Sequence, residues 1–147
     1  MRKIDKIVLH CSATPEGRDI KTSTVRKWHV EDNGWKDIGY HYVIELDGNV
    51  ERGRPIERTG AHAKGHNSTS IGICYIGGCD KHLQPKNTMR RAQELSLIRL
   101  VRHFLNEYPN AKVIGHNELD SGKACPSFNV QKWLEENGFP HGNISKN

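Results

Sequence analysis

Histidine and cysteine side chains that could share one metal ion lie near opposite ends of the chain, and this constrains the fold more than any other feature. Cys125 directly precedes a proline, His116 lies shortly before Cys125, and His10 lies on the first apolar run. Zinc at a working site commonly takes three ligands from histidine, cysteine and carboxylate side chains and leaves a fourth position for water. We therefore predict a zinc site that joins both ends of the chain in one domain.

Length and composition fit such a domain. A chain of 147 residues buries about two-thirds of its unfolded surface without needing disulfide bonds. Charged residues make up 27% of the chain, the mean hydropathy is −0.73, and no apolar run approaches the roughly 20 residues of a membrane span. The first residues lead into a strand-like run without a signal-peptide core. We expect synthesis in the cytoplasm, one domain over residues 1–139, and a polar, frayed tail over 140–147.

The net charge of +5 favours anionic partners, and both nucleic acid and the acidic bacterial wall fit that description. The four cysteines suit a reducing compartment, where thiols stay free or bind metal. Cys74 and Cys79 lack zinc-finger spacing, so we expect both to be buried or half-buried thiols. Successive side chains on a strand point to opposite faces, so His10 and Cys11 cannot both face one ion. We assign the ligand to His10 and expect Cys11 in the core.

Strand-like and helix-like segments alternate, which predicts an α/β fold with a central mixed sheet flanked by helices. The strongest local signal is a hairpin around Asp47-Gly48. Thr22 or Ser23 is expected to cap the first helix and Thr88 the longest. The expected strands cover 4–11, 39–46, 49–52, 70–78 and 111–114; the expected helices cover about 22–34, about 89–108, and from Asn129 or Ser127 to Gly138; a long loop covers 53–70.

Several short motifs, taken together and in order, resemble a known enzyme family. They are Val8-Leu9-His10-Cys11-Ser12-Ala13-Thr14, Gly39-Tyr40-His41-Tyr42, His62-Ala63-Lys64-Gly65 with Asn67, Ser70-Ile71-Gly72-Ile73-Cys74, and Lys123-Ala124-Cys125-Pro126-Ser127-Phe128. They are similar to motifs of type-2 N-acetylmuramoyl-L-alanine amidases, a superfamily that includes the peptidoglycan recognition proteins. The resemblance spans roughly residues 4–137. It implies a zinc amidase domain over residues 1–139, one Zn²⁺ per chain, and the ligands His10, His116 and Cys125.

The resemblance also implies a reaction, hydrolysis of the amide that joins the lactyl group of N-acetylmuramic acid to L-alanine in peptidoglycan. Zinc lowers the pKa of bound water towards 7 and polarises the carbonyl. Tyr40 and Lys123 resemble the family's catalytic pair. In an extended segment, Lys123 and Cys125 would point to the same side, which would place an ammonium group beside the metal.

The group that takes the proton from the attacking water stays open. Glu118 follows His116 by two residues and could act as the base or orient a ligand histidine. His62 and Asn67 match the family's loop and are candidates for binding the stem peptide or sugar. His41 would face away from Tyr40 on a regular strand, and we interpret it as structural.

Other functions fit parts of the same pattern. Some peptidoglycan recognition proteins bind muropeptide without cleaving it, but that branch often lacks the cysteine ligand, so Cys125 favours catalysis. A phage relative also binds and inhibits RNA polymerase, a property of one protein's surface that motifs do not transfer. We expect a monomeric endolysin-type enzyme that acts on peptidoglycan after reaching the wall, without nucleic acid or membrane partners. RNA polymerase is the alternative partner.

Overall fold

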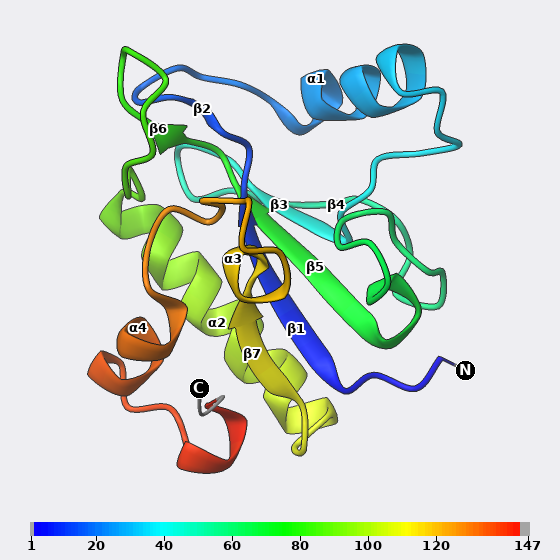
Figure 1. Ribbon diagram of the computed structural model, residues 1–147, viewed down its shortest axis with the longest axis vertical. Coiled ribbons are helices and arrows are strands. Elements are labelled where there is room, and N and C mark those ends of the chain that lie inside the picture. The colour runs from blue at the N-terminus through cyan, green and yellow to red at the C-terminus, as the bar shows by residue number, and fades with distance from the viewer. Residues whose placement is uncertain (1, 145–147) are drawn as a thin grey trace.

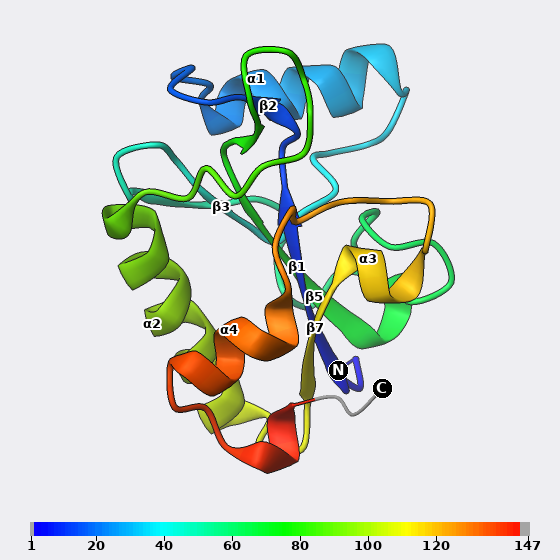
Figure 2. The ribbon, with the colours of Figure 1, turned by 60° about the vertical axis from the view of Figure 1, so that its left-hand side comes forward.

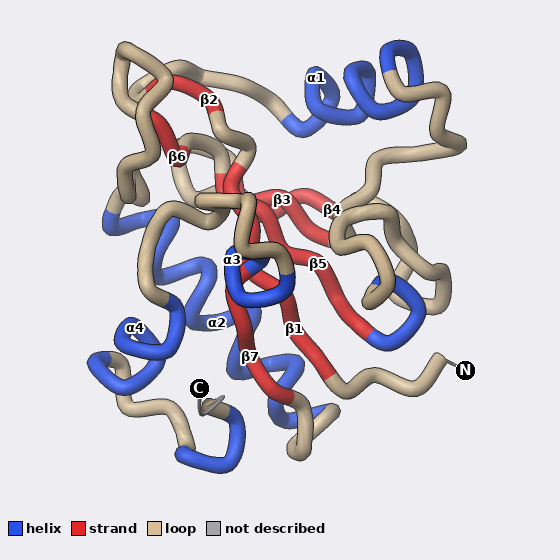
Figure 3. Tube along the Cα trace, in the orientation of Figure 1, coloured by secondary structure: helices blue, strands red, loops and turns tan. Residues whose placement is uncertain are grey.

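A mixed β-sheet forms the centre of the computed structural model, which describes residues 2–144 (Figure 1). The strand order is β4-β3-β5-β1-β7 (Figure 3). Neighbouring strands are parallel except at the edge, where β4 pairs with β3 in the antiparallel direction. Its strands are β1 (Lys6–Cys11), β3 (Tyr42–Ile44), β4 (Val50–Arg52), β5 (Ser70–Tyr75) and β7 (Lys112–Gly115), and a separate parallel pair joins β2 (Thr14–Pro15) to β6 (Gly78–Cys79). The predicted α/β sheet and its hairpin are confirmed.

β1 occupies the middle of the parallel part of the sheet, between β5 and β7 (Figure 1). A parallel strand covered on both faces is a continuous apolar run, and Ile7, Val8 and Leu9 are at most 1% exposed. Every residue of β5 is buried as well. Ligand sites of such sheets lie beyond the carboxyl ends of the strands, so the end of β1 is where a site is expected.

Helices α2 (Arg91–Glu107) and α4 (Val130–Glu136) cover one face of the sheet, and α3 (His116–Leu119) lies on the other (Figure 2). Alternation along β1 sends Ile7, Leu9 and Cys11 into the main core, where they meet apolar side chains of α2 and α4. The expected core position of Cys11 is confirmed, and the expected burial of Cys74 and Cys79 as free thiols is confirmed too. Within residues 2–144, no helix is long and apolar enough to cross a bilayer.

The opposite face of β1 carries Val8 and His10, and it is covered by smaller apolar clusters. Val8 packs with Ala63 of the long loop and with Ile114. On β3, Val43 packs with Val25 of α1. The covering segments are α1 (Thr22–Lys27), its π-helical continuation η1 (Trp28–Asp32), α3, and the loop that ends in the 3₁₀ turn η2 (Asn67–Thr69).

The longest helix begins later than its expected cap. Arg90 is the N-cap of α2, and its N–H donates a hydrogen bond to the Gln93 side chain at 2.9 Å. The expected cap, Thr88, instead accepts a hydrogen bond from the Gly78 N–H at 2.8 Å. Thr88 is therefore wrong as a cap, because it satisfies the backbone of β6 and leaves the cap position to a residue closer to the helix.

The first helix shows a similar difference, whereas the last one follows the sequence pattern. Lys21 is the N-cap of α1, so the expected caps Thr22 and Ser23 lie inside the helix. The Thr22 hydroxyl instead donates to Glu45 Oε2 at 2.8 Å, which ties α1 to the end of β3. At the start of α4, the Asn129 side chain accepts a hydrogen bond from the Lys132 N–H, as the capping pattern predicts.

Residues 141–144 pack against the domain instead of fraying. They form η3 (His141–Asn143) and a bridge between Ile144 and Val113 of β7. The Asn143 amide donates to the carbonyls of Pro109 and Ala111, each at 2.8 Å, and Ile144 is 7% exposed. The expectation of a frayed tail is wrong for these residues, because one apolar and one amide side chain find partners at the start of β7. Residues 145–147 of the expected tail lie outside the described residues.

Candidate metal centre and active site

Two histidines lie at the carboxyl ends of the adjacent parallel strands β1 and β7. β1 and β7 pair in a register that places Leu9 opposite Gly115. The next residues are His10 and His116, so both side chains emerge at the same edge and on the same face of the sheet. Their ring centroids are 4.7 Å apart. Strand register thus brings together two imidazoles that lie far apart in the sequence.

Cys125 reaches the same point from the loop between α3 and α4. The Asn117 N–H donates to the Cys125 carbonyl at 2.8 Å, and the Cys11 N–H donates to Cys125 Sγ at 3.2 Å. Cys125 Sγ lies 3.6 Å from His10 Nδ1. One ligand atom each from His10, His116 and Cys125 lies within 4.8 Å of the other two. The three predicted ligand residues therefore form a cluster that can hold a metal ion.

The surroundings keep both imidazoles of this cluster neutral. Burial, together with the neighbouring His62 and His116, lowers the pKa of His10 well below its ordinary value. Burial and the nearby Lys123 ammonium lower the pKa of His116. Neutral imidazoles offer a lone pair to a metal. The neighbouring Cys11 thiol and burial raise the pKa of Cys125 above its ordinary value, and the Cys11 N–H opposes part of that rise, so a bound metal would displace the thiol proton.

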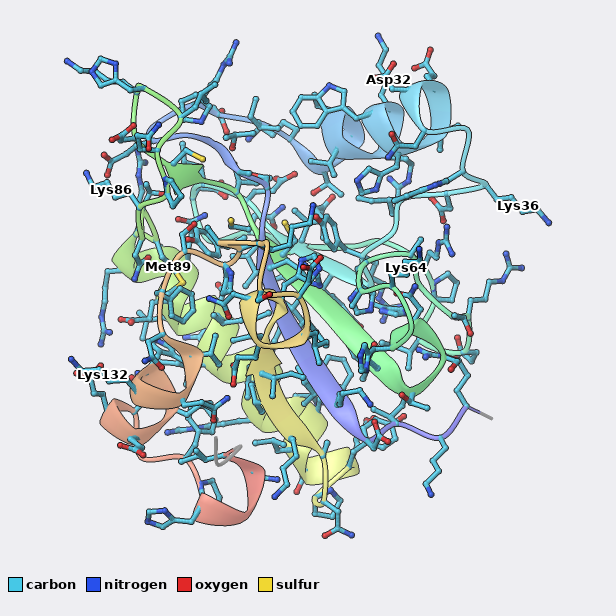
Figure 4. The ribbon with its side chains drawn as sticks, viewed as in Figure 1. Asp32, Lys36, Lys64, Lys86, Met89 and Lys132 are labelled. Carbon is cyan, nitrogen blue, oxygen red and sulfur yellow. The ribbon has the colours of Figure 1, made fainter. Side chains whose placement is uncertain are left out.

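A groove of about 650 Å³ opens over the cluster. One wall is aromatic. The centroid of the His29 ring lies 4.8 Å from that of Trp35 and 5.4 Å from that of Tyr40. The other sides come from α3 with the turn after it and from the loop that carries Lys64, which Figure 4 labels beside the sheet. The groove therefore combines an aromatic wall, a basic rim and a candidate metal site.

Tyr40 and Lys123 border this groove from different walls. The Tyr40 ring lies 5.1 Å from the His10 ring, and burial raises the pKa of its phenol well above the ordinary value. Lys123 is exposed at the rim. The expected extended segment is not formed there, because the Lys123 N–H donates to the Asp120 carbonyl at 3.0 Å and the chain turns. Lys123 nevertheless lines the same groove as His10 and His116.

His62 and Asn67 also line the groove, and both make hydrogen bonds within the protein. His62 Nδ1 lies 2.8 Å from His10 Nε2, and the His62 side chain is buried. Asn67 Oδ1 accepts hydrogen bonds from the N–H groups of His62 and Ala63 at 2.8 and 2.9 Å. Asn67 therefore shapes the loop, and the loop holds His62 against His10.

Glu118 lies on the side of α3 that faces away from the groove. Its carboxylate accepts hydrogen bonds from the Gly115 N–H at 2.6 Å and from the Gln131 amide at 2.9 Å. It borders a second cavity, of about 790 Å³, that is also lined by α4 and shares Lys123 with the groove. These contacts hold the start of α3, which carries His116 as its first residue.

Several supporting residues carried little signal in the sequence. The Arg2 guanidinium donates to the carbonyls of Ile56 and Ser70, among others, and so ties the N-terminus to the long loop.

His41 is fully buried and accepts a hydrogen bond from the Gly72 N–H at 3.0 Å, which agrees with a structural role. Gly72 leaves room for a ring, because a Cβ there would lie 2.6 Å from His62 Cγ. A glycine inside an apolar strand was the available sequence signal, since it indicates close approach.

Comparisons with known proteins show the family of this chain. A family model described as N-acetylmuramoyl-L-alanine amidase matches residues 1–128. The endolysin of Escherichia phage T7 is 42% identical over 133 residues, or 90% of this chain and 87% of the relative. The endolysin of Klebsiella phage KP32 is 40% identical over 136 residues, or 92% of this chain and 89% of the relative. The structure of N-acetylmuramoyl-L-alanine amidase LysC from Clostridium intestinale URNW matches with a TM-score of 0.78 and 26% identity over 95% of this chain and 88% of that one. The chain therefore belongs to the N-acetylmuramoyl-L-alanine amidase family, as its motifs indicate.

Proposed function

We propose that this chain is a zinc-dependent endolysin that hydrolyses the amide between N-acetylmuramic acid and L-alanine in peptidoglycan. The observation that carries the proposal is the meeting of His10, His116 and Cys125 beneath a groove bordered by Tyr40 and Lys123. The family match and the phage endolysins among its relatives support the same reaction.

The donor set and its spacing support zinc as the metal. Two imidazoles and a thiolate with one position left open are typical of catalytic zinc, whereas magnesium and calcium prefer oxygen ligands. With Zn–N near 2.0 Å, Zn–S near 2.3 Å and a tetrahedral angle, the nitrogen and sulfur ligand atoms lie about 3.5 Å apart. Cys125 Sγ and His10 Nδ1 are 3.6 Å apart. These two side chains therefore fit zinc as they stand.

When bound, zinc would supply an acidified water molecule and polarise the scissile carbonyl. The protein's own groups would stabilise the negative charge that develops on the carbonyl oxygen. Because the Tyr40 phenol keeps its proton at neutral pH, it can donate a hydrogen bond to that oxygen. The Lys123 ammonium can donate a second, charge-assisted hydrogen bond from the rim. We assign both residues to oxyanion stabilisation.

The contacts of Glu118 support an orienting role over that of a base. Its carboxylate accepts hydrogen bonds from Gly115 and Gln131, and it lines the cavity on the other side of α3. By holding the start of α3, it fixes the direction from which His116 approaches the metal.

The aromatic wall and the loop around Asn67 would bind the substrate on either side of the scissile bond. Sugar rings present apolar faces that pack on aromatic side chains, and Trp35 is partly exposed along this wall. Asn67 lines the groove while shaping its loop, and His62 lines it while contacting His10. We place the stem peptide or sugar along these residues.

Digestion of purified sacculi followed by mass analysis tests the proposed reaction. We expect released peptides that begin with L-alanine and no new reducing sugar ends. A chelator should stop the release, and added zinc should restore it. New reducing ends would indicate a glycosidase instead, and muropeptide binding without any release would indicate a binding module.

We further expect the protein to be a monomer and to make no stable complex with RNA polymerase. We expect it to reach the cell wall after release from the cell or by an export route that needs no signal peptide. Size-exclusion chromatography with light scattering tests the first point. Capture of host proteins on the immobilised, zinc-loaded chain tests the second, and recovered polymerase subunits would contradict it.

A further inference from the structure

A line of buried side chains runs from the candidate metal centre into the protein. His10 Nδ1 faces Cys125 Sγ at 3.6 Å, while His10 Nε2 lies 2.8 Å from His62 Nδ1. On its far side, His62 Nε2 lies 3.1 Å from the Ser70 hydroxyl. His10, His62 and Ser70 are at most 8% exposed. The ligand histidine is therefore bonded through its second nitrogen to another histidine, which is itself bonded to a serine.

The direction of these hydrogen bonds decides whether His10 can bind a metal. A neutral imidazole carries one proton, so one nitrogen donates while the other accepts. If His10 Nε2–H donates to His62 Nδ1, then His10 Nδ1 keeps its lone pair and His62 Nε2–H donates to Ser70. If the direction is reversed, His10 Nδ1 carries the proton and cannot act as a ligand. Only the first arrangement suits a metal between His10 and Cys125.

The position of His62 is set by its surroundings. Its ring lies on the backbone of Gly72, where a Cβ would come within 2.6 Å of His62 Cγ. Its backbone N–H is held by the Asn67 side chain at 2.8 Å. The rings of His10 and His62 meet edge to face, with an interplanar angle of 89°. His62 thus offers its Nδ1 to His10 in one orientation.

We propose that His62, supported by Ser70, is a positioning residue that fixes the tautomer and the ring orientation of His10 and thereby raises the affinity for zinc. This inference rests on the proposed zinc site, and it gives His62 a role besides lining the groove. Groups that hold a metal ligand by its second nitrogen typically contribute a factor of about 10 to 100 in metal affinity. We expect an effect of that size here.

Two substitutions separate hydrogen bonding from packing at this position. His62→Asn can place its Oδ1 near the position of the imidazole Nδ1 and still accept the proton of His10 Nε2. His62→Leu is of similar bulk and accepts nothing. We expect zinc affinity, measured by competition with a chelating dye, to fall about 10- to 100-fold in His62→Leu and only a few-fold in His62→Asn. Ser70→Ala should give a small loss.

Tyr40→Phe is the matched control, because the Tyr40 ring packs against His10 but its hydroxyl is not the partner of His10 Nε2. Its zinc affinity should stay near that of the unsubstituted protein. Circular dichroism and thermal melts of each metal-free variant establish that it is folded. Wild-type affinity in a folded His62→Leu protein would overturn the proposal, as would an equal loss in His62→Asn and His62→Leu.

A measurement on the unsubstituted protein keeps the proposal testable even if a variant does not fold. Long-range ¹⁵N–¹H NMR spectra of the zinc-loaded protein report which nitrogen of each imidazole carries the proton. We expect His10 and His62 each to carry it on Nε2, and a proton on Nδ1 of either ring would overturn the proposal. Failure of the unsubstituted protein to bind zinc would instead refute the proposed function.

Discussion

Acidification should destabilise the metal-free protein between pH 7 and pH 5.5, because three buried histidines stay neutral in the folded state. Burial lowers the pKa of His41 to about 4 and that of His62 to about 3, against about 6.5 for an unfolded chain. Burial also lowers the pKa of His10 well below its ordinary value. Since the unfolded state binds protons first, stability is complete above about pH 6.5 and is lost as the pH falls.

The magnitude follows from proton linkage. At pH 5.5 the unfolded chain protonates most of each imidazole, while the folded protein binds almost no proton at His41 and His62. Each of these residues therefore removes about 1 kcal/mol of unfolding free energy between pH 7 and pH 5.5. The two together remove about 2 to 3 kcal/mol, and His10 adds to that loss. Carboxylates contribute little in this window, because their ordinary pKa values lie near 4.

Urea unfolding in the presence of a chelator, followed by tryptophan fluorescence, measures this loss, because Trp133 is buried in the main core. The His62→Asn variant removes one of the titrating groups, so its loss over the same pH range should be smaller by about 1 kcal/mol. A wild-type loss below about 1 kcal/mol would refute the reasoning, because it would mean that these imidazoles titrate in the folded protein as they do in water.

Four further changes test separate parts of the structure. Lys123→Ala should retain zinc and lower kcat by about a hundredfold or more, and near-normal turnover would remove Lys123 from the mechanism. Cys125→Ala should lose both zinc and activity, whereas stoichiometric zinc in that variant would contradict its assignment as a ligand. Gly72→Ala should cost about 1 to 3 kcal/mol in urea unfolding, because the new Cβ meets the His62 ring; an unchanged midpoint would show that the ring can move. Arg2→Ala should speed amide hydrogen exchange in residues 56–70, because Arg2 binds carbonyls at both ends of this segment, and unchanged exchange would mean that other contacts hold the loop.

Local patterns in the sequence were sufficient for the main elements of the fold. Buried parallel strands appear as continuous apolar runs, and the hairpin appears as a turn dipeptide between an apolar strand and the largely exposed strand β4. The periodicity of α2 also predicts its buried face, since Leu97, Val101 and Phe104 enter the main core. Helix caps were less predictable, because the hydroxyl of Thr88 can bond to any nearby backbone group, and the nearest one belongs to β6.

The sequence by itself determined which residue types are present for metal chemistry, and its motifs assigned His10, His116 and Cys125 to one cluster. Only the tertiary structure decided how they meet, because the register between β1 and β7 sets the two histidines side by side. It also decided which nitrogen of His10 faces the thiol and that His62 bonds to the other. Such contacts depend on strand pairing and loop closure between residues far apart in the chain, and no local pattern encodes them.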